Sequence, residues 1–288
     1  MFVDILRRHE RPASREADFP LLTEKQVEQY EEDGYLLLPR YLRREEIDVL
    51  RAELPVVFEE DSPRRVLEEG SGIVRGVHGV HETNSVFRTL VRLPRLVEPA
   101  RQLLGGDVHV FQFKINAKLA LAGDVWEWHQ DYRFWHDEDG MPTDRALSAA
   151  ILLDDVDEFN GPLMFVPGSH REGLCAVHTR DADWTQTLTS KLKYSLRVEA
   201  LAAAAKQRGI VAPKAPAGSV LLFHSNILHG SGPNMSPDNR TMVLVSYNSV
   251  ENPLRDVANP RPAFLASRTP DPVRTVGDDA LAAGFPRV

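Results

Sequence analysis

The sequence predicts a mainly β domain, a double-sheet sandwich or jelly roll with flanking helices. Two blocks of strand-like sequence, which begin at Asp107 and at Gly218, follow a helical N-terminal third. A long segment, residues 171–216, separates the blocks and is interpreted as an insertion or lid over the strands. Strands and helices do not alternate as in βαβ units, and the glycine motifs of dinucleotide and P-loop sites are absent from the sequence.

Composition indicates a globular protein, with 288 residues of which 42% are hydrophobic and 26% are charged. We expect one domain over residues 1–288, with residues 1–20 as an arm and the proline-rich residues 252–288 as a tail. The single cysteine, Cys175, excludes an internal disulfide and suits a reducing cytoplasm. The net charge is −8, no basic patch is interleaved with aromatic residues, and no apolar run reaches the ~18 residues of a membrane span. We therefore expect a cytoplasmic monomer or homodimer without nucleic-acid or membrane partners.

Helical patterns occupy most of the region before the first strand block. Thr23, with Gln26 three residues later, has the spacing of a capping box, and Gly34 provides a stop, so a helix is expected between them. The other predicted elements of this region are a short apolar strand and turn over residues 35–42, a helix over 44–57, and a helix over 84–104 interrupted near Pro94.

Alternating or continuous apolar runs predict the strands of the two blocks. The runs cover residues 108–121, 125–133, 145–156, 161–170, 218–230 and 240–250. Within the insertion between the blocks, the alanine-rich run at 198–209 predicts a helix.

The stretch VWEWHQDYRFWHDEDGMP, residues 125–142, combines three of the four tryptophans with several ionisable groups. On a strand over 125–133, His129 and Asp131 point to the same face, roughly 7 Å apart, and both can reach one metal ion. Such His-x-Asp pairs also occur by chance. The alternative interpretation is that His129 and Asp131 are surface residues on a polar strand face and bind no metal. Residues 136–138 precede a turn sequence and are interpreted as a solvated loop.

A third metal ligand is expected from the second strand block, where GSVLLFHSNILHGSG contains His224 and His229. His224 lies within an apolar strand, where a hydrogen-bonded core histidine is the commoner outcome. His229 follows that strand in a predicted loop with Gly230 and Ser231, so the spacing favours His229. Two histidines and one carboxylate form the facial triad that binds non-haem Fe(II) and leaves three positions open.

Arg240 stands at the head of the apolar strand TMVLVSYN. An arginine that points into a barrel needs an anionic partner, because an unpaired buried charge is very unfavourable, and its planar guanidinium matches a carboxylate. An exposed arginine at a strand edge is the alternative. The His-x-Asp pair, the distal histidine and this arginine are hard to explain together as coincidence.

These segments resemble a known family. The marks are WHQDYRFWHDEDGMP, FNGPLMFVPGSH, QFKIN and YNSVEN, together with the HGS run at 229–231 and Arg240. They resemble the Fe(II)- and 2-oxoglutarate-dependent dioxygenases of the phytanoyl-CoA dioxygenase superfamily. The resemblance spans residues 22–255 and is closest to the branch of ectoine hydroxylase and the bacterial free amino-acid hydroxylases. It implies a double-stranded β-helix core, the jelly-roll arrangement that cupins also have.

The resemblance implies roles for individual residues. Iron would be held by the catalytic residues His129, Asp131 and His229, and Arg240 with Ser231 would bind the distal carboxylate of 2-oxoglutarate. Trp128, Phe134 and Trp135 are expected to wall the site. The other implied pocket residues are Gln112 and Lys114 for the cosubstrate and Arg75, Asn116, Trp135 and Asn248 for the substrate.

The activity implied by the resemblance is hydroxylation of an unactivated C–H bond in a small polar metabolite. Fe(II) is the implied cofactor and 2-oxoglutarate and O2 the cosubstrates, with ascorbate supporting activity, and an aspartate at position 131 implies hydroxylation rather than chlorination. Ectoine hydroxylases typically have serine and arginine where this chain has Gln130 and Lys114, which favours a free L-amino acid of a biosynthetic pathway over ectoine. Arg75 or Arg133 would then bind the amino-acid carboxylate. Alternatives outside this class are a non-catalytic β-sandwich that binds a small ligand and a cupin-like metal protein that works without 2-oxoglutarate.

Overall fold

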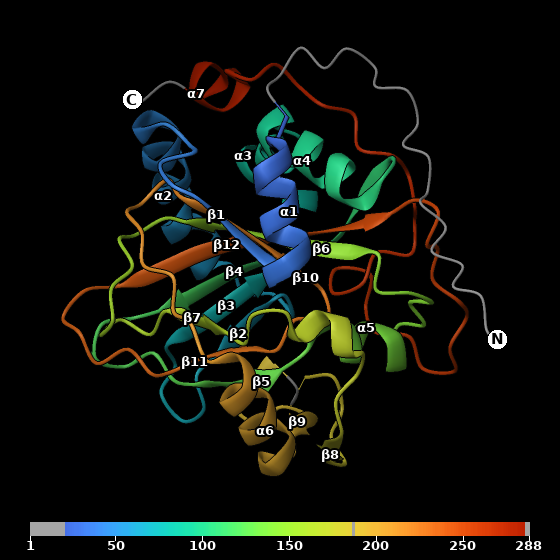
Figure 1. The fold of residues 1–288 in the computed structure, drawn as a ribbon. Coiled ribbons are helices and arrows are strands. Elements are labelled where there is room, and N and C mark those ends of the chain that lie inside the picture. The colour runs from blue at the N-terminus through green and yellow to red at the C-terminus, as the bar shows by residue number, and fades with distance from the viewer. Residues whose placement is uncertain (1–20, 186–187, 286–288) are drawn as a thin grey trace.

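The computed structural model describes residues 21–185 and 188–285, so the predicted arm at 1–20 lies outside the described residues. A large antiparallel sheet crosses the middle of the molecule (Figure 1). The N-terminal helices lie on one side of it, and a smaller sheet with the insertion lies on the other (Figure 1). No helix in these described ranges combines the length and the hydropathy that a membrane span requires.

The N-terminal helices largely follow the sequence pattern. They are α1 (Glu24–Asp33), α2 (Arg44–Glu59), α3 (Ser85–Leu90) and α4 (Pro94–Leu104), and a 3-10 turn, η1 (Val80–Glu82), precedes α3. The capping box is confirmed, because the Thr23 side chain accepts from the Gln26 amide while the Gln26 side chain accepts from the Thr23 amide. Gly34 ends α1 with a φ of 80°, a conformation that suits glycine. The predicted interruption before Pro94 is also confirmed.

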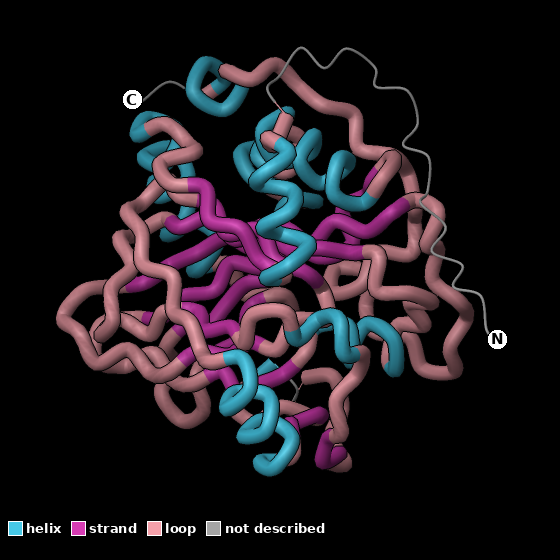
Figure 2. The backbone as a smooth tube through the Cα atoms, in the orientation of Figure 1, coloured by secondary structure: helices cyan, strands magenta, loops and turns pink. Residues whose placement is uncertain are grey.

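Both sheets are antiparallel. Among the described residues, the large sheet has seven strands in the order β1 (Tyr35–Leu38), β10 (Val220–His224), β6 (Ala146–Leu152), β12 (Arg240–Ser249), β4 (Val108–Lys118), β3 (Val74–His78) and β2 (Arg65–Leu67). The small sheet has β5 (Trp126–His129), β11 (His229–Ser231) and β7 (Leu163–Phe165) in that order. Magenta strands therefore form two layers with the helices outside (Figure 2), which is the expected mainly β jelly roll.

The central strands β4 and β12 divide their side chains between the two faces of the large sheet. Ile115 lies opposite Val243 in the ladder, and both pack against the helices in the main apolar core. Met242 and Leu244 belong instead to a second apolar cluster, with Phe165 of the small sheet. Because side chains alternate along a strand, the even-numbered polar residues of β4 share the face that looks toward the small sheet.

The insertion forms a small unit beside the small sheet. It begins with the turn η2 (Ser169–Glu172), continues through the strand pair β8 (Val177–Thr179) and β9 (Tyr194–Leu196), and ends with helix α6 (Val198–Arg208). The predicted helix is thus confirmed. The chain then returns to the scaffold through a bridge between Val211 and Phe165. In the tail, α7 (Ala280–Gly284) packs near α2 and α3.

Three local predictions were wrong. The strand predicted over 125–133 stops at His129, because Asp131 begins helix α5 (Asp131–Asp137). Tyr132 donates its amide to the Ser225 carbonyl, so the chain has turned out of the sheet there. Residues 136–138 therefore lie at the end of this helix and not in a loop. His229, predicted to lie in a loop, begins strand β11.

Candidate active site

The register of the small sheet brings two distant histidines together. Strands β5 and β11 are antiparallel, with His129 directly opposite His229, and the two ring centroids are 4.2 Å apart. His224, the other candidate, ends β10, and its ring lies 4.9 Å from the ring of His170. Its Nδ1 accepts a hydrogen bond from the Asn226 amide. The geometry therefore groups His229, and not His224, with His129.

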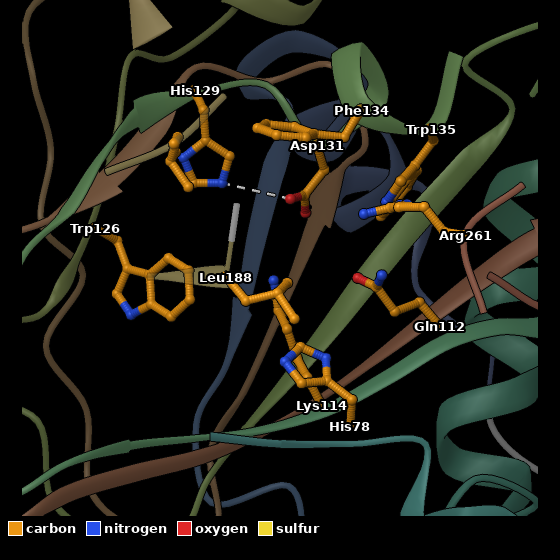
Figure 3. A pocket seen from close by; sticks show the side chains of 11 residues that line it. His78, Gln112, Lys114, Trp126, His129, Asp131, Phe134, Trp135, Leu188 and Arg261 are labelled. Atoms are coloured by element: carbon orange, nitrogen blue, oxygen red, sulfur yellow. Dashed lines mark ion pairs between the residues drawn. The ribbon is translucent and has the colours of Figure 1, made fainter. Parts of the chain in front are cut away.

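Asp131 completes a compact cluster with these histidines. Figure 3 shows its carboxylate facing the His129 ring. Its Oδ1 lies 3.4 Å from His129 Nε2, and its Oδ2 lies 3.8 Å from His229 Nε2. All three residues are buried, and Oδ2 has no hydrogen-bond partner within the described part of the chain. Their potential ligand atoms lie within 4.8 Å of one another. A buried polar atom without a partner is unfavourable, and a metal ion between the three groups would compensate it.

The backbone prepares both imidazoles as metal ligands. His129 Nδ1 donates to the Glu127 carbonyl at 2.7 Å, and His229 Nδ1 donates to the Ile227 carbonyl at 3.0 Å. A carbonyl oxygen only accepts, so the proton stays on Nδ1 and the Nε2 lone pair faces Asp131. Burial, and then the neighbouring His129, lower the pKa of His229 to about 3, so this ring is neutral at physiological pH.

The carboxylate is ionised in the same place. Burial alone raises the pKa of Asp131, but its neighbours outweigh burial and hold the pKa well below its usual range, first through the positive charge of Lys114 and then through His229 and His129. The donor set is therefore two imidazoles and one carboxylate, which is the set that non-haem Fe(II) prefers.

Gln130 fixes the turn between the two ligands of the HQD segment. Its side chain is 1% exposed, and its Nε2 donates to the carbonyls of Asn226 and Gly173 at 2.8 and 2.9 Å. Its Oε1 accepts from the Cys175 amide at 2.9 Å. This role of Gln130 was not predicted from the sequence, where the residue stood out only as a departure from a family pattern, although a glutamine between two expected metal ligands is itself a usable indication.

A pocket that opens to solvent lies in front of the cluster. Of the residues expected to line it, Gln112, Lys114, Phe134 and Trp135 do so. Five lining residues were not predicted from the sequence. They are His78, Trp126, Leu188, Leu192 and Arg261.

The other expected pocket residues lie elsewhere. Arg75 and Asn116 line a smaller adjoining hollow, where Asn116 Oδ1 has no hydrogen-bond partner among the described residues. Asn248 instead binds His109 and Asn252 through its amide. Trp128 packs against the cluster of Val166 and Leu228, so its expected place in the pocket wall was wrong.

Arg133 is not positioned to bind a substrate carboxylate in the pocket. Its guanidinium donates to Asp137 of the same helix and to the Cys175 carbonyl.

Arg261, which comes from the tail, is a cation that does line the pocket (Figure 3). It is paired with buried Asp139, from which its Nε lies 2.8 Å. Burial lowers the pKa of Arg261, but Asp139 outweighs burial and raises it overall.

Arg240 and Ser231 lie at one end of the sandwich, and Lys118 lies next to both. Arg240 is fully buried and donates twice to the Gly161 carbonyl, whereas its Nη1 and the Ser231 hydroxyl have no partner in the described ranges. Lys118 lies opposite Arg240 across β4 and β12 and donates to the carbonyls of Ser231 and Gly232. Burial lowers the pKa of Arg240 to about 9, and burial followed by Arg240 lowers the pKa of Lys118 to about 6. This end of the fold would be stabilised by an anion.

Comparisons with known proteins agree with this geometry. The model of the phytanoyl-CoA dioxygenase (PhyH) family matches residues 30–242. L-proline trans-4-hydroxylase of Streptomyces griseoviridis is 42% identical over 268 residues, which cover 91% of this chain and 98% of the relative. Ectoine dioxygenase of Bordetella parapertussis is 41% identical over 255 residues, covering 86% of this chain and 83% of the relative.

Solved structures give the same result. The crystal structure of EctD from S. alaskensis with 2-oxoglutarate and 5-hydroxyectoine superposes with a TM-score of 0.79 at 32% identity, covering 92% of this chain and 91% of that one. The structure of the same protein with bound Fe has a TM-score of 0.76, covering 88% of this chain and 87% of that one.

Proposed function

The chain belongs to the phytanoyl-CoA dioxygenase family, and on that premise we propose that it is an Fe(II)- and 2-oxoglutarate-dependent hydroxylase of a free L-amino acid. The observation that carries this proposal is the buried cluster of His129, Asp131 and His229 at the wall of a pocket. When bound, iron and 2-oxoglutarate supply the oxidation, in which O2 is consumed, succinate and carbon dioxide are released, and the substrate gains a hydroxyl group.

The chain's own residues hold and orient the reactants. The two backbone-anchored imidazoles and the ionised Asp131 would hold iron on one face and leave the pocket side open. At the other end, the free Nη1 of Arg240 and the Ser231 hydroxyl would bind the distal carboxylate of 2-oxoglutarate. Lys114 and Gln112, which line the pocket, would bind its other polar groups.

The pocket suits an amino acid better than a purely polar metabolite. Apolar side chains of Trp126, Leu188 and Leu192 line it and would keep water from the reacting C–H bond. Arg261 offers a cation for the substrate carboxylate, and Trp135 and Asn116 would complete the binding surface. The relative named L-proline trans-4-hydroxylase supports an amino-acid substrate, with L-proline as the first compound to test.

Hydroxylation of ectoine is the second candidate. It is supported by the ectoine dioxygenases at 41% identity and by the fold similarity to EctD with bound 5-hydroxyectoine. Location in the cytoplasm, and a monomeric or homodimeric state, belong to the same proposal and would be checked by fractionation and light scattering.

One assay separates these possibilities. The purified protein is incubated with Fe(II), ascorbate, 2-oxoglutarate and, in turn, L-proline, other L-amino acids and ectoine, and succinate and hydroxylated product are measured. We expect product from an amino acid in amounts equal to succinate. Product from ectoine alone would favour the second candidate, and no product-linked succinate from any compound would reject the proposal.

A variant tests the cosubstrate site separately. Arg240→Gln is expected to raise the KM for 2-oxoglutarate by about 100-fold, because a buried charge partner of the carboxylate is lost. Arg145→Gln is the matched control, because Arg145 pairs with Glu251 at the surface. An unchanged KM in Arg240→Gln would place the cosubstrate elsewhere.

A further inference from the structure

The insertion contributes an apolar wall to the pocket. Leu188 and Leu192 both line it, and Figure 3 shows Leu188 between Trp126 and Lys114. Leu188 also lines the adjoining hollow together with these two residues. Leu188 is 8% exposed and Leu192 is 2% exposed, so these side chains are packed inward. A segment far from the iron-binding strands in sequence therefore forms part of the surface that a substrate meets.

Arg75 holds this wall from behind. Its Nε donates to the Leu188 carbonyl at 3.2 Å, and its Nη2 donates to the Val125 carbonyl at 2.7 Å and to the Thr189 carbonyl at 3.4 Å. Its Nη1 pairs with Glu68 at 2.8 Å. All three nitrogens are thus engaged by the protein, and the side chain is 1% exposed.

The same guanidinium supports the aromatic side of the pocket. It stacks on the indole ring of Trp126, with its central carbon 3.8 Å from the ring centroid. Arg75 therefore joins the strand that carries His129 to the insertion that carries Leu188. Only a planar, forked cation donates to two chain segments while one face covers an aromatic ring.

The other end of this wall is held at the surface. Glu127 accepts from the Leu192 amide at 3.0 Å, and Arg180 donates to the Leu192 carbonyl at 2.9 Å. Arg180 is 44% exposed, so water competes for these contacts. The buried anchor of the wall is Arg75.

We propose that Arg75 is a positioning residue that fixes Leu188 at the pocket wall, and that Leu188 sets the size of the substrate side chain. The proposal rests on the proposed function for its substrate class, an amino acid with a small apolar side chain or ring. It replaces the expectation that Arg75 binds the substrate carboxylate, because Glu68 and backbone carbonyls engage that guanidinium.

Hydrogen exchange tests the positioning role without catalysis. In the metal-free protein, Arg75→Lys keeps a cation beside Glu68 but cannot donate to Leu188, Thr189 and Val125 together. We expect amides 188–193 to exchange about 10-fold faster in this variant, with no change in the segments that Arg75 does not contact. Arg65→Leu is the matched control, because Arg65 lies on the neighbouring strand and binds Asp61 and carbonyls near α2.

A second variant keeps the test decisive if Arg75→Lys fails to fold. The double substitution Arg75→Leu with Glu68→Leu removes both buried charges together, so neither is left unpaired. Faster exchange at 188–193 in both folded proteins supports the proposal. Unchanged exchange in both would overturn it.

Substrate size tests the role of Leu188. L-pipecolate has one ring methylene more than L-proline, and one methylene in an apolar pocket changes kcat/KM by about 10- to 200-fold. Leu188→Ala is expected to raise the ratio of kcat/KM for L-pipecolate over L-proline at least about 10-fold. Arg75→Lys should shift the same ratio less and should raise the KM for L-proline without changing that for 2-oxoglutarate.

The outcomes are distinguishable from failure of the proposed function. An unchanged ratio in an active Leu188→Ala protein would overturn the size-selecting role. If the unsubstituted protein oxidised neither amino acid, the proposed function would fail in this respect, whereas hydrogen exchange would still decide whether Arg75 holds Leu188.

Discussion

Strand β4 presents Phe113 and Ile115 to the helices and Gln112 and Lys114 to the pocket, and the two faces differ in almost every physical property. Phe113 and Ile115 are fully buried in the main apolar core. Gln112 and Lys114 line the pocket beside the metal-binding cluster. Since the side chains alternate, a slip of one residue in register would exchange the two sets. The fold thus assigns stability to one face of a single strand and chemistry to the other.

The two faces also differ in how well their groups are satisfied. Each large apolar side chain on the helix face stabilises the fold by about 1.5–3 kcal/mol on burial. On the pocket face, Gln112 donates to the Leu265 carbonyl, but Asn116 Oδ1 and Arg240 Nη1 have no partners in the described residues. Unpartnered buried groups are destabilising until a ligand arrives. Burial of apolar side chains on the helix face therefore offsets the unfavourable free energy of the unpartnered polar groups, which the pocket face holds in place for ligands.

The largest expected effect falls on the chemistry face. Asp131→Ala should lower product formation at least about 1000-fold, because one of the three iron ligands is lost, while the variant remains folded. Succinate release, Fe(II) binding and urea denaturation measure these effects. Asp137→Ala is the control on the same helix, since Asp137 pairs with Arg133 away from the pocket. Product formation near that of the unsubstituted protein would show that Asp131 is not a ligand.

The opposite result is expected on the helix face. Phe113→Ala should lower the unfolding free energy by about 3–5 kcal/mol, because a fully buried ring is replaced by a cavity. Iron affinity of the folded protein should stay within a factor of about two, since the ring points away from the cluster. Phe159→Ala is the matched control, because Phe159 is 63% exposed. A large loss of iron affinity in Phe113→Ala would show that the two faces are coupled.

Local sequence patterns predicted the elements whose structure depends on near neighbours. The capping box at Thr23, the break before Pro94 and the strands β4 and β12 all formed as expected. Each depends on hydrogen bonds or apolar alternation within a few residues. The preference for His229 over His224 agrees with the geometry, which groups His229 with the other two residues, although His229 lies in strand β11 and not in the predicted loop.

Long-range contacts decided the features that the sequence did not reveal. The chain turns at Gln130, whose side-chain amide forms hydrogen bonds with Asn226, Gly173 and Cys175. All three partners are distant from Gln130 in sequence. Arg261 reaches the pocket from a proline-rich tail that shows no periodic pattern. Such contacts depend on how segments pack, and packing is invisible to spacing within one segment.

A smaller effect than that of Asp131→Ala is expected from Gln130, which lies between two of the metal ligands. Gln130→Ala should weaken Fe(II) binding about 10-fold, because groups that orient metal ligands contribute 10- to 100-fold to affinity. Titration with Fe(II) or Co(II) measures this. Gln102→Ala is the matched control, because Gln102 also makes two backbone hydrogen bonds, to Leu22, but lies in α4. It should reduce stability and leave metal affinity unchanged. Equal affinities in both variants would reduce Gln130 to a structural role.

The smallest expected effect concerns His109 at the start of β4, where its Nε2 accepts from the Asn248 amide. Burial is the main cause that lowers the pKa of His109 to about 4, against 6.5 for the unfolded chain. Between pH 6.5 and 4 the unfolded chain binds a proton that the native ring does not. The contribution of neutral His109 to the unfolding free energy is therefore fully present above pH 6.5 and is lost as the pH falls through this window.

His109→Gln should reduce the slope of unfolding free energy against pH in this window by about 1 kcal/mol per pH unit. His178→Gln, at an exposed position on β8, is the control and should leave the slope unchanged. Equal slopes in the two variants would mean that His109 is protonated in the native protein, and that this end of β4 is open to water rather than packed like the helix face.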